Sequence, residues 1–176
     1  MSMSLIEQVI ALDERDDLHI IRVLILIYTL IGKKNEKTTI ELTKLAKLDF
    51  LLRYPSALET TLNNLNKKKD ISITEAEKNN IETNVLSFRF SPWSSDFRRL
   101  MVLLNAKFLI RWERRERYLD IHQTSKGLML YQELLEYDEF KTMYQQSKAI
   151  KTNCYTLSMI KLDTLLSKTL TELTLR

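Results

Sequence analysis

Few side chains in this sequence could carry out nucleophilic or metal-assisted chemistry. The two histidines, His19 and His122, stand about 100 residues apart, and neither has a partner at a metal-ligand spacing. The single cysteine, Cys154, has no identifiable base to activate it and is expected to be a small buried apolar residue. With only 2 glycines the chain cannot form a glycine-rich phosphate loop. We therefore expect no catalytic, metal or cofactor site, and a protein that is not an enzyme.

Arginines concentrate in residues 111–118, which read Arg-Trp-Glu-Arg-Arg-Glu-Arg-Tyr. The candidate binding residues in this segment are Arg111, Trp112, Arg114, Arg115 and Arg117. Guanidinium groups bind phosphate oxygens through two N–H groups, so these side chains could contact DNA. Three interpretations stay open: a solvated hairpin with ion pairs to Glu113 and Glu116, an acidic surface on a protein partner, or DNA phosphates.

Two smaller features complete the candidate set. The first is a run of three lysines at the end of a predicted third helix (residues 55–66): Lys67, Lys68 and Lys69. In a DNA-reading winged helix this would be the recognition helix, yet it has no arginine and Glu59 would face phosphates, which favours protein contact over DNA. The second feature is Trp93, in a predicted loop, which is either a core residue or a partner anchor, as is Trp112.

The elements that must position these residues are mostly helical. A helix that is apolar almost all round is predicted over residues 17–32 and is expected in the middle of the fold. Later helices are expected to begin at Thr38 or Thr39, at Pro55, at Ser95 or Asp96, and at Thr124 or Ser125. Alternating residues 108–114 and 118–122 predict a β-hairpin, and residues 85–90 a further strand. Gly127 lies where a helix starts, which allows close backbone approach.

This order predicts a mainly α fold with a small β-hairpin, namely a winged helix-turn-helix core with additional C-terminal helices. We assign the winged-helix domain to residues 17–135, with an irregular polar insertion at about 70–95, and a helical extension to residues 137–176. Leucines recur at helical spacing within that extension, so it needs a surface to pack against.

Charge and targeting features bound the function further. The 27 basic and 23 acidic residues give a net charge of +4, which permits contact with nucleic acid without requiring it. The N-terminus lacks the basic start and apolar run of a signal peptide. The longest apolar stretch, residues 20–31, is too short to cross a bilayer. We expect a cytoplasmic protein without a membrane partner or a small-molecule substrate.

Two passages resemble a known family. Residues 49–55, Asp-Phe-Leu-Leu-Arg-Tyr-Pro, follow an Ile-rich first helix and are similar to the middle components of bacterial three-component ABC ATPase defence systems. The passage from Leu104 to Gly127 is similar to the winged-helix part of the same proteins. This group includes the small SMC-associated subunit of Lamassu-type anti-phage systems. The resemblance spans roughly Leu18 to Leu135.

The resemblance implies a non-enzymatic adaptor in an anti-phage or anti-plasmid complex. Such a subunit binds an SMC-like or ABC-type ATPase near its head domains and links it to an effector, often a nuclease, with DNA contacted through the complex. The alternative is a free-standing winged-helix transcriptional regulator that dimerises through its C-terminal helices and binds an operator.

Overall fold

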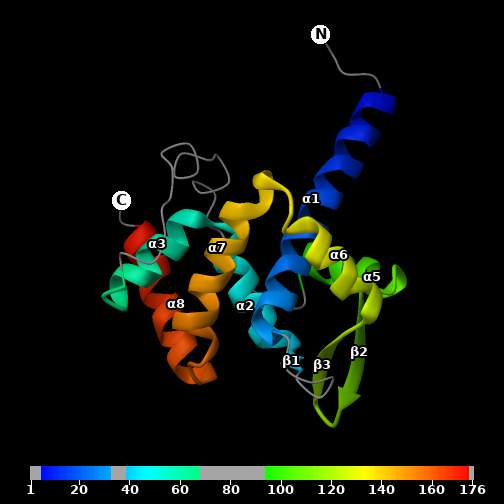
Figure 1. Ribbon diagram of the computed structural model, residues 1–176. Coiled ribbons are helices and arrows are strands. Elements are labelled where there is room, and N and C mark those ends of the chain that lie inside the picture. Colours follow the sequence, from blue (N-terminus) through cyan, green and yellow to red (C-terminus); the bar gives the residue numbers. More distant parts are fainter. Residues whose placement is uncertain (1–4, 33–38, 68–93, 175–176) are drawn as a thin grey trace.

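A computed structural model of the chain describes residues 5–32, 39–67 and 94–174. The elements are α1 (Leu5–Ile31), β1 (Ile40–Glu41), α2 (Leu42–Arg53), α3 (Pro55–Asn64), α5 (Ser95–Ala106), β2 (Ile110–Arg115), β3 (Tyr118–Gln123), α6 (Ser125–Leu134), α7 (Lys141–Ile150) and α8 (Met159–Thr174). A 3-10 turn (Asp138–Phe140) precedes α7 and a π-helical turn (Lys151–Tyr155) follows it. The fold is mainly helical with one small antiparallel sheet, and the hairpin projects from its side (Figure 1).

Helix α1 forms the centre of the molecule, as its all-round apolar sequence predicts. Leu24 and Leu26 are fully buried, and α2, α5, α6 and α7 all pack against this helix. The predicted start at residue 17 is wrong, because the backbone is helical from Leu5. Residues 5–16 contain no glycine or proline, and their apolar residues recur at helical spacing. No helix-breaking residue therefore separates them from residues 17–31.

The hairpin is confirmed and belongs to a three-stranded sheet of order β1-β3-β2. Strands β2 and β3 pair from Ile110 opposite Gln123 to Arg115 opposite Tyr118. The predicted helix start at Thr38 or Thr39 is wrong, because Ile40 and Glu41 form β1 beside β3 and α2 begins only at Leu42. Ile40 is 2% exposed, so burial of its side chain adds to backbone pairing in holding this strand.

The base of the hairpin is fixed to α1 by Tyr28. Its hydroxyl donates a hydrogen bond to the Leu109 carbonyl at 2.6 Å and accepts one from the Thr124 backbone N–H at 3.0 Å. Thr124 caps α6 by accepting the Gly127 N–H, as predicted. A Cβ on Gly127 would overlap the Leu109 carbonyl oxygen and the Tyr28 hydroxyl, so the close approach expected at this glycine is confirmed.

The starts of helices α3 and α5 differ in how closely they match the prediction. Helix α3 begins at Pro55 as expected, since proline fits the first helical turn. Helix α5 is capped by Ser94, whose hydroxyl accepts the Phe97 N–H, one residue before the predicted Ser95 or Asp96. The predicted strand at residues 85–90 and most of the insertion lie outside the described residues.

The C-terminal helices share the core with the rest of the chain. Helix α7 packs on α1 and α2, and α8 packs along α3 (Figure 1). Leu162 and Leu166 of the predicted leucine stripe are fully buried. The hydroxyls of Thr61 and Thr169 are hydrogen-bonded at 3.0 Å, and Lys47 forms an ion pair with Asp163. No helix in the described parts combines the length and hydropathy that crossing a membrane requires.

Candidate functional site

The structure brings the four predicted arginines together on the exposed hairpin. Arg111, Arg114 and Arg115 lie on β2, and Arg117 lies in the turn, where Glu116 has a left-handed backbone with φ of 52°. All four side chains are exposed. Because side chains alternate along a strand, Arg111 and Arg115 lie on one face of β2, and Trp112 and Arg114 lie on the other. Trp112 is opposite Ile121, is half-buried and packs against the core.

These arginines are held loosely. The Arg115 side chain is 81% exposed, and its guanidinium lies 4.0 Å from the Asp120 carboxylate. Arg114 donates a 3.5 Å hydrogen bond to the Glu116 backbone carbonyl rather than to a carboxylate. His122 lies 3.4 Å from Glu113 across the strands. Cross-strand ion pairs therefore account for part of the charge, and the hairpin tip keeps guanidinium groups that face solvent.

Sequence reasoning missed the basic residues on the helix that leads into the hairpin. Arg98 and Arg99 are exposed on α5, and Lys107 and Lys126 are exposed beside its C-terminal end. Residues 94–127 contain eight Lys or Arg and four Asp or Glu, a balance of +4, which leaves 19 of each sign in the rest of the chain. The whole net charge of the protein thus belongs to α5, the hairpin and the start of α6. Counting charge by segment would have found this surface.

The lysine run lies elsewhere. Lys67 is exposed just after α3, which is across the molecule from the hairpin in Figure 1. Lys68, Lys69 and Trp93 lie outside the described residues. The structure therefore does not bring Lys67 together with the hairpin arginines.

Helix α3 packs its apolar face against the rest of the fold. Leu58 and Leu62 are buried, and α8 packs along this helix. The Asn64 amide donates to the Glu172 carboxylate of α8 at 3.2 Å, so it does not face a nucleic acid. The helix that leads directly into the hairpin is α5. For the third helix the sequence favours protein contact over DNA, and the structure shows that α8 of the same chain packs along it.

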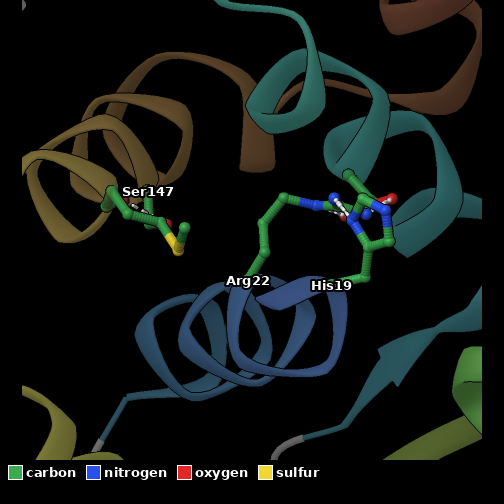
Figure 2. Close-up of polar contacts among 5 residues, drawn as sticks. His19, Arg22 and Ser147 are labelled. Atoms are coloured by element: carbon green, nitrogen blue, oxygen red, sulfur yellow. Dashed lines mark hydrogen bonds and ion pairs between the residues drawn. The ribbon is translucent and has the colours of Figure 1, made fainter. Parts of the chain in front are cut away.

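A buried polar cluster joins α1 to α2 and was not foreseen. The Arg22 guanidinium binds both carboxylate oxygens of Asp49, at 3.0 and 3.3 Å, and its third nitrogen lies 2.6 Å from His19 Nδ1 (Figure 2). Both ion-pair side chains are under 10% exposed. Ser147, in the same view, donates to the Met143 carbonyl of its own helix at 2.9 Å. Asp49, the first residue of the 49–55 passage, is therefore a core residue that fixes α2 against α1.

A depression of about 650 Å³ lies between α1, α6 and α7. Its wall includes Tyr131, which stacks on the Tyr28 ring and whose pKa is raised by burial. Its cations already have partners: Lys151 donates to the Thr29 carbonyl at 2.7 Å, and Lys148 lies 5.4 Å from the Tyr144 ring centre. The Tyr28–Tyr131 stack joins α6 to α1, and the Lys151 hydrogen bond joins the turn after α7 to α1, so these lining residues hold the helices together.

The other groups with reactive chemistry are the thiol of Cys154 and the side chains that could bind a metal ion. Cys154 is fully buried, and burial raises the pKa of its thiol to about 12, which confirms it as an apolar residue. Among the residues that the structure describes, no three of His, Cys, Asp and Glu gather in a way that could hold a metal ion.

Comparison with family models, curated proteins and solved structures gives no match for this chain.

Proposed function

We propose that this chain is a non-enzymatic adaptor with a winged helix-turn-helix core, and that the hairpin and α5 form its docking surface for a larger partner. Two features support the winged-helix interpretation. The sheet order β1-β3-β2 places a short early strand beside the hairpin, and α5 runs straight into β2, as a recognition helix runs into a wing. In this arrangement α5 takes the place of the recognition helix.

The observation that carries the proposal is the confinement of the net charge to residues 94–127. Arg115, at 81% side-chain exposure, contributes almost nothing to packing, so its charge is available to a partner. A concentrated cationic surface steers association with a polyanion and orients it. An acidic face of a protein or the phosphates of DNA both meet that requirement.

The resemblance of residues 49–55 and 104–127 supports one class of partner. In this proposal the hairpin docks on an acidic surface of an SMC-like or ABC-type ATPase, and another face reaches an effector, often a nuclease. The protein would act in the cytoplasm as part of an anti-phage or anti-plasmid complex. It would transmit the state of the ATPase without making or breaking bonds itself.

Co-expression with the products of the neighbouring genes tests this proposal. A tagged chain should co-purify with a large coiled-coil ATPase, and the triple variant Arg114→Ala, Arg115→Ala, Arg117→Ala should lose it. A matched control removes three exposed lysines from the C-terminal half, Lys141, Lys161 and Lys168, and should retain the ATPase. A chain that stays alone with every neighbouring product contradicts the proposal.

A free-standing DNA-binding regulator is the second candidate, and the position of α5 favours it. Arg98 and Arg99 are exposed on the first half of this helix, ahead of the hairpin. A gel shift across salt concentrations separates the two functions. A regulator should prefer its operator over random DNA by about 4 kcal/mol or more. An adaptor should bind DNA weakly, without sequence preference and only at low salt.

A further inference from the structure

Helix α5 ends in an unusual way. The Phe108 N–H donates to the Asn105 carbonyl and the Leu109 N–H to the Leu104 carbonyl, both at 2.9 Å. This pattern is a Schellman cap, in which the residue after the helix adopts a left-handed backbone. That residue is Phe108, with φ of 58°. Glycine is the usual residue there because a Cβ is strained in this conformation.

Two other helices of the same chain end on residues that suit a left-handed backbone. Helix α3 has the same pair of hydrogen bonds, from Asn66 to Asn63 and from Lys67 to Leu62, with Asn66 at φ of 60°. Helix α1 ends at Gly32, with φ of 71°. Asparagine and glycine tolerate this region, whereas an aromatic residue rarely adopts it. Phe108 is therefore a backbone outlier.

The Phe108 ring gains little from the fold in return. Phe108 is 72% exposed, so its apolar surface remains mostly in water. Thr124 donates to the Phe108 carbonyl at 2.8 Å, a backbone contact that glycine would also make. Strain and exposure at one residue together point to a role outside the folded chain.

Other exposed apolar side chains accompany Phe108. Lys126 donates to the Lys107 carbonyl at 2.9 Å, which brings the first turn of α6 against the end of α5. Met129, one turn further along α6, is 71% exposed, and Val102 on α5 is 48% exposed. The junction surface, defined here as Val102, Lys107, Phe108, Lys126 and Met129, is thus apolar with a basic component.

Cations outnumber acidic residues around this junction. Residues 96–112 and 121–133 contain five Lys or Arg and two acidic residues, Asp96 at the start of α5 and Glu133 one turn beyond Met129 on α6. The cations of these two segments are Arg98, Arg99, Lys107, Arg111 and Lys126. Large apolar side chains flanked by carboxylates are therefore the chemistry that complements this surface.

We propose that the junction surface, at the C-terminal end of α5, is the part of the docking surface in which Phe108 anchors an amphipathic, acidic helix of a protein partner. Phe and Met are enriched in protein interfaces, and Phe108 is the single aromatic ring among the five residues of the junction surface, which therefore offers no succession of aromatic faces on which nucleobases could stack. The inference rests on the proposed function and deepens it, because it gives the α5 side of the docking surface an occupant that does not depend on the hairpin arginines. Strand β2 places the hairpin tip about 17 Å from the junction surface.

A direct titration tests the site without any neighbouring protein. The probe is a fluorescent amphipathic helical peptide of about 15 residues built from leucine and glutamate, with a leucine–lysine peptide as charge control and an all-glutamate peptide as apolar control. Binding to the full chain is followed by anisotropy. The leucine–glutamate peptide should bind most tightly, and Phe108→Gly and Phe108→Ala should each weaken it about tenfold or more.

Melting temperature separates this role from a structural one. Phe108→Gly should melt at the same or a higher temperature than the natural chain, because it removes strain and little burial. Asn66→Gly, the matched cap control, should leave peptide affinity unchanged, as should the hairpin triple variant. Equal binding of the three peptides, affinity within about twofold for Phe108→Gly, or a marked loss of melting temperature in Phe108→Gly would each overturn the proposal. Because the hairpin is not involved, this test and the co-expression test can fail independently.

Discussion

Arginine occurs in two contrasting settings in this molecule. Arg22 is buried between α1 and α2, with two of its nitrogens on Asp49 and its side chain 8% exposed. Arg115 is on the hairpin, with its side chain 81% exposed and its nearest carboxylate, Asp120, 4.0 Å away. The same guanidinium group is thus part of the packing in one place and nearly independent of the fold in the other. A group that the fold does not use for its own stability is available for a partner.

The two settings also differ in the free-energy cost of removing a charged side chain. A buried ion pair is desolvated, so removal of either partner leaves an uncompensated charge in the core. An exposed arginine stays hydrated whether or not a carboxylate is near. Substitutions in the two settings should therefore differ strongly in their effect on the free energy of unfolding.

The largest effect is expected at the buried pair. Asp49→Ala leaves the Arg22 charge buried without a carboxylate and should lower the free energy of unfolding by about 3–5 kcal/mol. Urea denaturation measures it. The double variant Arg22→Met, Asp49→Leu should be less destabilised than Asp49→Ala, because it leaves no unpaired charge. If Asp49→Ala costs under about 0.5 kcal/mol, as at a surface position, then Arg22 is effectively hydrated and the contrast with the hairpin fails.

A second effect tests how firmly the hairpin base is joined to the core. Gly127→Ala forces the Leu109 carbonyl or the Tyr28 hydroxyl to move, which should cost about 1–3 kcal/mol in thermal or urea unfolding. Gly32→Ala is the comparison: its Cβ would meet the Lys151 ammonium, at the end of a long side chain, at 2.9 Å, and the strain at φ of 71° should cost about 1 kcal/mol. A smaller loss for Gly127→Ala than for Gly32→Ala would show that the base of the hairpin is loosely held.

A structural feature could be predicted from the sequence where its signal lies within a few neighbouring residues. The core position of α1 follows from its all-round apolar residues, and the hairpin follows from alternation on both sides of a turn. Thr124 and Gly127 were predicted because a cap and a close approach leave a signal within three residues. Strand β1, Ile40–Glu41, has two residues and therefore shows no alternation of its own.

Contacts between distant segments left no local signal. Thr61 and Thr169 are 108 residues apart, so nothing near either residue indicates that α8 covers α3. The pairing of Arg22 with Asp49 is similarly long-range, although a lone arginine in an apolar helix calls for an acidic partner. At the site, the hairpin arginines were predicted from their clustering. The left-handed backbone of Phe108 could not be predicted, because that position usually holds glycine.

The smallest effect on stability is expected at the hairpin tip. The triple variant Arg114→Ala, Arg115→Ala, Arg117→Ala removes side chains that face solvent, and it should change the free energy of unfolding by less than about 1 kcal/mol in total. The same variant should abolish partner capture. At the hairpin, unlike at Asp49, a substitution should therefore remove binding and leave the free energy of unfolding nearly unchanged. Urea unfolding of the purified variant beside the natural chain measures this. A loss comparable to that of Asp49→Ala would show that these arginines stabilise the fold. That result would contradict their assignment to a docking surface.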